Sequence, residues 1–364
     1  MRKYKMPAIS VFVLVALGVT LFTGVPNIVK IILIALALGG LVWASWGNHL
    51  FQQAAKIIKS KDRSKMNDAI AYLESAIKAG MGDRNTLVAA SLVVQYGDKE
   101  LGAKELMRLS LNKQRDIRCN AKVSLSMYWW SEGDLDRAIE LIEECQKENW
   151  RHTNFFINGA TYYLEKDDEK SFRRMISEAK KANAYSVPLI ESESVYELRK
   201  GNWKNAGILL TKVFEMKEPV FPDPYIHMAV VYLNYGEVGK ALEIMKRGLG
   251  SQFSNTSIID RARLESWISQ LENEDTRLDM AEAMAKGIEH MIQREDITYT
   301  PTGRKCNLDK LEGYEELPDF HVNDEELPEE MRGYGEQSEE DEPTEADTDL
   351  DESDEEWLRK HQDD

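Results

Sequence analysis

Residues 1–55 show little alternation between hydrophobic and polar positions and instead form two long apolar runs. No Asp, Glu, Lys or Arg occurs in residues 6–29 or, after Lys30, in residues 31–55. A helix needs about 20 predominantly apolar residues to cross the hydrocarbon core of a bilayer. The pattern therefore predicts two transmembrane helices, over residues 7–25 and 28–46, which meet the lipid bilayer and are joined by a tight Gly-Val-Pro-Asn turn.

Basic residues flank this apolar pair on both sides. Arg2, Lys3 and Lys5 precede it, and five more lysines and arginines follow within residues 56–65. Because positively charged flanks stay on the cytoplasmic side, we expect a two-span protein of the cell membrane with both termini in the cytoplasm. A cleaved signal peptide followed by one anchor is the alternative, but residues 23–26 lack a small-x-small cleavage pattern.

A different pattern begins after residue 48, with helix-length amphipathic segments joined by turns that contain glycine and an acidic residue. The clearest unit spans residues 124–145, with Gly133-Asp134 between its two apolar segments. One position, at the start of the second segment, recurs at spacings of 34, 35, 34, 34 and 35 residues. Its occupants are Ala69, Ala103, Ala138, Phe172, Ala206 and Ala241.

These units resemble the tetratricopeptide repeat, a helix–turn–helix of about 34 residues. The resemblance implies an all-α fold, with about six repeats stacked into a right-handed solenoid over residues 49–255 that follows a transmembrane hairpin at 1–48. Phe172 departs from the small residue typical of its position. The unit around it is therefore expected to be splayed or differently packed.

In this repeat family the first helix of each unit lines an inner groove, so the resemblance also implies a set of partner-binding positions. Those positions are mostly apolar here, which favours a protein or peptide partner. The alternative, given equal weight, is that they form core between neighbouring helices. They are Val88, Leu92, Val123, Met127, Trp130, Ile157, Leu164, Val195, Leu198, Ile226, Val230 and Leu233.

The repeat pattern fades after residue 255. Apolar residues at helical spacing over 258–271 and 278–292 predict two helices that cap the solenoid within residues 256–294. The segment 295–364 is rich in acidic residues and proline, which predicts a disordered acidic tail. Within it the tetrapeptide Glu-Glu-Leu-Pro occurs twice, at 315–318 and 325–328. The tail is interpreted as a solvating segment, with short binding motifs as the alternative.

Charge is distributed very unevenly. The net charge of −17 is made of +4 in residues 1–46, zero in residues 47–310 and −21 in residues 311–364. No segment has the basic excess that phosphate contacts require, so a nucleic-acid partner is not expected. The three cysteines are too scattered for a disulfide framework, and the six histidines show no metal-ligand spacing, so neither a metal nor another cofactor is expected.

These patterns together predict a membrane-anchored scaffold for protein–protein interaction that presents its groove to a cytoplasmic partner. A self-assembling or tail-autoinhibited adaptor of a membrane complex is the alternative, in which case the chain would form homo-oligomers or bind its own tail. The sequence has no glycine-rich phosphate loop, no Gly-x-Ser-x-Gly motif and no kinase motif set. The carboxylate runs at 143–144 and 167–169 are interpreted as solvated charges, so enzymatic activity is not expected.

Overall fold

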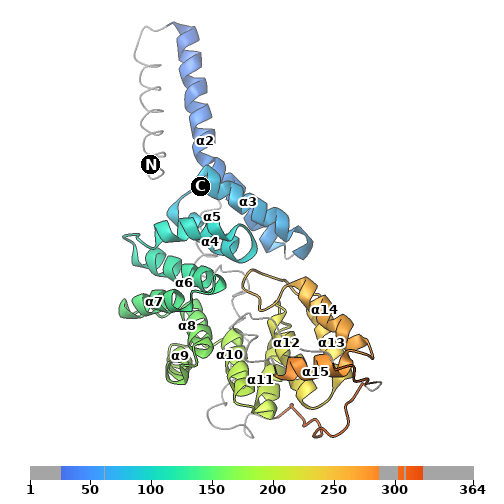
Figure 1. The fold of residues 1–364 in the computed structure, drawn as a ribbon. Helices are drawn as coiled ribbons and strands as arrows, with labels where there is room; N and C mark the ends of the chain where they lie inside the picture. The colour runs from blue at the N-terminus through green and yellow to red at the C-terminus, as the bar shows by residue number, and fades with distance from the viewer. Residues whose placement is uncertain (1–25, 61, 287–301, 307–308, 323–364) are drawn as a thin grey trace. The chain divides into compact units, whose positions relative to one another are not determined.

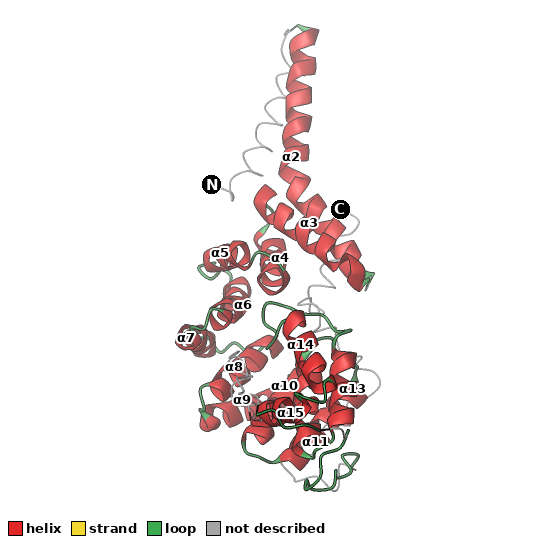
Figure 2. Ribbon diagram, turned by 45° about the vertical axis from the view of Figure 1, so that its right-hand side comes forward, coloured by secondary structure: helices red, strands yellow, loops and turns green. Residues whose placement is uncertain are grey.

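The computed structural model describes residues 26–60, 62–286, 302–306 and 309–322. Within these ranges the chain is all-α, which confirms the predicted fold class at that level, and strand pairing is limited to one isolated bridge (Figure 2). A short 3-10 turn, Arg63–Lys65, precedes α3. The helices are α2 (Asn27–Lys59), α3 (Met66–Ala79), α4 (Asp83–Tyr96), α5 (Lys99–Leu109), α6 (Arg115–Ser131), α7 (Leu135–Lys147), α8 (Thr153–Glu165), α9 (Glu169–Lys181), α10 (Val187–Arg199), α11 (Trp203–Met216), α12 (Asp223–Asn234), α13 (Val238–Gly248), α14 (Arg261–Glu272) and α15 (Arg277–Lys286).

The chain divides into two compact units, and the division falls inside α6, after Leu125. In the first unit α2 is one continuous helix that passes through the predicted boundary at residue 48. Its first half stands clear of the other helices of its unit (Figure 1), whereas Phe51, Ala54 and Ile58 in its second half are buried and the helix packs against α3. α4 and α5 then form an antiparallel pair.

The predicted span over 28–46 lies within α2, which is long and apolar enough to cross a membrane by length and composition. It is the single helix of that kind among the described residues. The other predicted span, over 7–25, lies outside the described residues.

The second unit is built from consecutive helices in contact: α8 with α9, α10 with α11, and α12 with α13, followed by α14 and α15. The same turn recurs between the two helices of each pair. A residue in the left-handed region follows the first helix at Asp167, Gly201 and Gly236, and Gly133 takes the same place between α6 and α7. At each turn the next residue donates its N–H to a carbonyl five residues earlier, for example Asp134 to Trp129 at 2.9 Å. This closing bond satisfies a carbonyl that the helix end would otherwise leave unpaired.

Two of these turns are followed by an aspartate whose side chain caps the next helix. The side chain of Asp134 accepts a hydrogen bond from the Arg137 amide at 3.1 Å, and that of Asp168 accepts one from the Ser171 amide at 3.0 Å. Such N-terminal caps each stabilise a helix by about 1 kcal/mol. Local sequence thus fixes where each hairpin turns.

The recurring small residues that set the sequence register are all buried. The alanines of that ladder, Ala69 through Ala241, have at most 1% of their surface exposed. Phe172 is buried as well, and its ring stacks on Tyr196 of α10 with centroids 5.2 Å apart. The larger side chain is thus accommodated by an aromatic partner on the next helix, and α8 and α9 still pack as a pair.

The C-terminal part of the chain differs from its prediction. The helix expected at 258–271 is α14, and the one expected at 278–292 is described only as far as Lys286. The prediction of a disordered tail from residue 295 is wrong for residues 309–322, which lie against α11 and α13 with two buried side chains, Leu311 and Phe320. Two apolar anchors are enough to hold a segment whose composition is otherwise acidic. The rest of the predicted tail, 323–364, lies outside the described residues.

Candidate interaction site

Most of the predicted groove residues are core residues. Val88, Met127 and Ile157 are half-buried. The other nine are buried: Leu92, Val123, Trp130, Leu164, Val195, Leu198, Ile226, Val230 and Leu233. Their apolar character is therefore explained by helix packing, which was the alternative interpretation, and no longer argues for an open groove. Contact of these positions with a partner stays a prediction.

Trp130 shows how these positions are used. Its indole N–H donates to the Glu165 carboxylate at the end of α8, and its ring lies 6.1 Å from that of Tyr162. The Tyr162 hydroxyl in turn shares a hydrogen bond of 3.0 Å with Ser126, and burial raises the pKa of Tyr162 far above its usual value. Trp130 thus links the end of α6 to α8 and is not an exposed partner-binding side chain.

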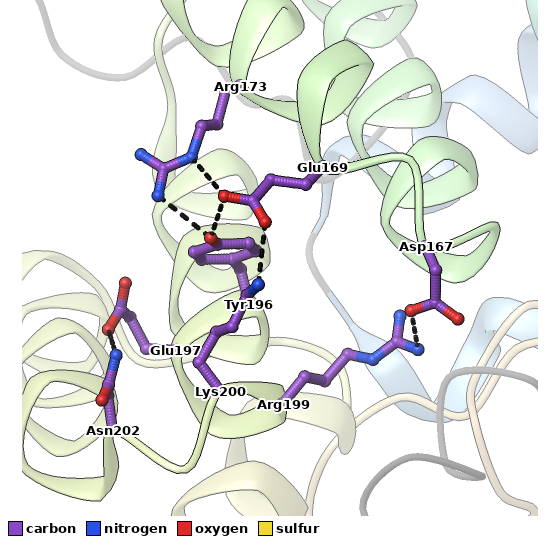
Figure 3. A network of polar contacts seen from close by, with 8 residues as sticks. All are labelled: Asp167, Glu169, Arg173, Tyr196, Glu197, Arg199, Lys200 and Asn202. Carbon is purple, nitrogen blue, oxygen red and sulfur yellow. Dashed lines mark hydrogen bonds and ion pairs between the residues drawn. The ribbon is translucent and has the colours of Figure 1, made fainter.

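A polar network of hydrogen bonds and ion pairs joins the start of α9 to the end of α10 on the surface of the second unit (Figure 3). The Glu169 carboxylate lies at its centre. It accepts from Tyr196 at 2.7 Å, from Lys200 at 2.8 Å and from Arg173 at 3.0 Å. These three donors hold the pKa of Glu169 at about 2, with the Lys200 hydrogen bond as the largest cause.

A second contact fixes the neighbouring turn. Arg199 pairs with Asp167 at 2.5 Å and also donates to the Leu164 carbonyl, so the end of α10 closes the left-handed turn between α8 and α9. Each of these charged side chains pairs with one of opposite charge within the network (Figure 3). The arrangement is therefore suited to fixing α10 against the α8–α9 pair rather than to binding a charged ligand.

Removing the central carboxylate gives a pH-dependent prediction. The folded pKa of Glu169 is depressed, so its contribution to stability is present above pH 4.5 and is lost as the pH falls toward 2. We expect Glu169→Gln to lower the thermal midpoint at pH 7, and the difference from the native chain to shrink steadily between pH 4.5 and 2. A difference that stays constant down to pH 2, measured by circular dichroism, would contradict this role.

A buried titratable group lies on the other side of α10. His227 of α12 is buried, its Nδ1 lies 3.2 Å from Glu191 of α10, and its Nε2 finds no hydrogen-bond partner among the described residues. Asp223, at the start of α12, accepts from the Ile258 amide at 2.9 Å. Desolvation and the nearby Glu191 carboxylate raise the pKa of Asp223 to about 6. Helical spacing in the sequence leaves His227 isolated, because Glu191 is 36 residues away along the chain.

The remaining feature that the sequence pattern did not predict is the segment over 309–322. The segment contains the first Glu-Glu-Leu-Pro copy, followed by Asp319 and Phe320, and this motif was the available sequence signal. Its apolar residues have no helical or strand periodicity. Among the described residues no group of His, Cys, Asp and Glu side chains could hold a metal ion.

No family model, no curated protein and no solved structure matches the chain. The function is therefore argued from the chain's own residues.

Proposed function

We propose that this protein is a membrane-anchored scaffold that binds a partner protein or peptide through a tetratricopeptide-like helical body. The observation that carries the proposal is the change of environment along α2. Its first half exposes Ile28, Ile31, Leu36 and Val42, whereas its second half enters the protein core. Nothing in the described chain covers this apolar surface, and an uncovered apolar helix of span length favours a bilayer.

The helical body supports the scaffold part of the proposal. The closing turn recurs at spacings of 34, 34 and 35 residues from Gly133 to Gly236, and the ladder of small buried residues has the same period. A body built from repeated hairpins presents an extended surface, and such surfaces are used to bind other proteins. Crosslinking in intact membranes, followed by mass spectrometry, tests for that partner.

The position of α2 can be tested with a matched pair of cysteine variants. Leu36 on α2 and Leu111 after α5 are both exposed leucines, at 58% and 84%. In a Cys306→Ser background we expect Leu111→Cys to react with a membrane-impermeant maleimide in inside-out membrane vesicles, which expose the cytoplasmic face, and Leu36→Cys to react less than one-tenth as much. Labelling after denaturation in SDS gives the total for each.

Equal labelling at the two positions would rule out burial of α2 in the bilayer. Protection of Leu36→Cys could also come from a second copy of α2, as the self-assembling alternative implies. Disulfide-linked dimers formed by Leu36→Cys on mild oxidation would indicate that arrangement, and their absence together with protection supports lipid contact.

A further inference from the structure

The segment 309–322, here called the strap, lies as a non-helical peptide with one turn at 312–314 on α11, α13 and the turn that precedes α13 (the strap is dark orange in Figure 1). Leu311 and Phe320, nine residues apart, are its two buried side chains, at 5% and 7% exposed. The strap residues between them are exposed or half-buried. The strap therefore resembles a bound peptide with two anchors more than a part of the helical core.

The first anchor is fixed by backbone pairing. The Gly239 amide donates to the Asp309 carbonyl at 2.8 Å, and the Leu311 amide donates to the Gly236 carbonyl at 2.7 Å. These bonds form an antiparallel bridge in which Lys310 faces Glu237, and their side chains pair at 2.8 Å. Backbone pairing of this kind recognises an extended chain whatever its sequence, and the Glu237 carboxylate adds a preference for a cation beside the aliphatic anchor.

The second anchor combines an aromatic residue with a hydrogen bond to a carboxylate. The Phe320 ring meets Tyr235 edge-on, with centroids 6.2 Å apart. The next residue, His321, places its Nδ1 2.8 Å from the Glu215 carboxylate. The surface thus has two apolar contact sites, one for each anchor, and each lies next to a carboxylate.

Glycines within two helices make room for the strap. A Cβ added at Gly207 in α11 would collide with the Phe320 ring, and one added at Gly239 in α13 would lie 3.1 Å from the Asp309 side chain. Neither glycine has a positive φ, so the backbone does not require it. Glycine in a helix interior, as at Gly207, costs about 1 kcal/mol relative to alanine. Gly207 therefore allows close approach of the strap at the expense of the stability of α11.

We propose that this surface of α11–α13 is a peptide-binding site, which the strap occupies in cis and which a partner protein occupies by displacing it. The partner segment carries a cation–aliphatic pair followed, nine residues later, by an aromatic residue and then a side chain that hydrogen-bonds a carboxylate, as Lys310-Leu311 and Phe320-His321 do. Two buried side chains hold the strap, together with the partly buried Leu317 and Val322 and the polar contacts given above. A segment with so few core contacts opens locally, without unfolding the helices beneath it. The site is independent of the proposed membrane anchor and does not use the predicted groove positions.

The test uses the full chain and two synthetic peptides of equal length. Peptide 309–322 carries both anchors, whereas peptide 323–336 carries the second Glu-Glu-Leu-Pro copy and a Gly-Tyr pair but has neither the Lys-Leu pair nor the Phe-His pair. Phe320→Ala in the chain weakens the strap. Because a competing cis segment lowers the apparent affinity by the fraction of open sites, we expect this variant to bind labelled peptide 309–322 at least tenfold more tightly than the native chain does.

Gly207→Ala in the Phe320→Ala chain should abolish binding of the peptide, because the added Cβ occupies the space that the phenylalanine ring of the peptide needs. Gly82→Ala, where a Cβ meets nothing within 4 Å, is the matched control and should leave binding unchanged. Circular dichroism checks that each variant folds. If the Phe320→Ala chain binds both peptides equally or neither, the strap is a fixed part of the fold and the proposal fails. If the native chain forms a dimer that Phe320→Ala dissolves, the occupant is the strap of a second copy and the partner assignment is overturned.

Discussion

Replacing Trp130 by alanine should lower the free energy of unfolding of the second unit by about 3 to 5 kcal/mol, the range for a large aromatic side chain removed from a core. Trp130 is 9% exposed, contacts the Tyr162 ring and donates its indole N–H to Glu165. The variant loses the apolar contacts and the hydrogen bond together. Urea unfolding followed by circular dichroism measures the change as a shift of the midpoint at constant slope.

This experiment separates the two interpretations of the predicted groove positions. A groove residue would lose partner binding on truncation with little change in stability, whereas a core residue loses stability first. Met216→Ala, which shortens an exposed apolar side chain on α11 of the same unit, is the control and should change stability by less than about 0.5 kcal/mol. A Trp130→Ala variant as stable as this control would restore the groove interpretation.

Replacing Asp223 by asparagine should stabilise the protein at pH 7 by roughly 1 to roughly 2 kcal/mol. The raised pKa of about 6 means that the folded chain holds this carboxylate charged at a cost. A pKa change of one pH unit corresponds to about 1.4 kcal/mol, and the half-buried position of the side chain reduces the full value. Asparagine keeps the oxygen that accepts from the Ile258 amide and removes the charge.

The sign of the pH dependence follows from the same shift. Below the ordinary carboxyl pKa of 3.8 the group is mostly protonated in both the folded and the unfolded chain, so the advantage of Asp223→Asn is smallest there. As the pH rises from 4 to 6 the unfolded chain loses its proton before the folded chain does, and the native protein loses stability relative to the variant. Glu191→Gln removes the neighbouring charge and should move this dependence to lower pH. An advantage that is the same at pH 3 and pH 7 would show that the charge of Asp223 is not the cause.

Local structure was largely predictable from the sequence because it depends on neighbouring residues. The Gly-Asp and Gly-Glu pairs at 133–134 and 236–237 mark turns that the structure has at those positions, since a left-handed residue followed by a helix cap is a local requirement. The small residues at the repeating spacing are buried as the helix-crossing argument requires. The helical pairs followed from these two signals.

The sequence did not predict which part of the molecule covers each apolar face. Periodicity shows that a face is buried, but it does not show which element or partner buries it. Leu198 and Val230 have the same helical spacing whether a neighbouring helix or a partner peptide lies on them, and the structure places both in the core. The packing of the strap was not predicted because its buried residues show no periodicity at all. Leu311 and Phe320 are separated by exposed or half-buried, mostly polar residues with no period, so the acidic composition of the segment outweighed its two anchors.

The continuity of α2 has a mechanical consequence for the anchor. A helix that leaves a bilayer and enters a protein core without a break cannot act as a flexible tether, because it transmits tilt and rotation along its length. The buried core residue Phe51 lies little more than one helical turn beyond Trp46. With α2 in the membrane as proposed, the first unit would be held rigidly, at a fixed short distance from the lipid headgroups. A partner of this unit would then be selected by its height above the bilayer as well as by its chemistry.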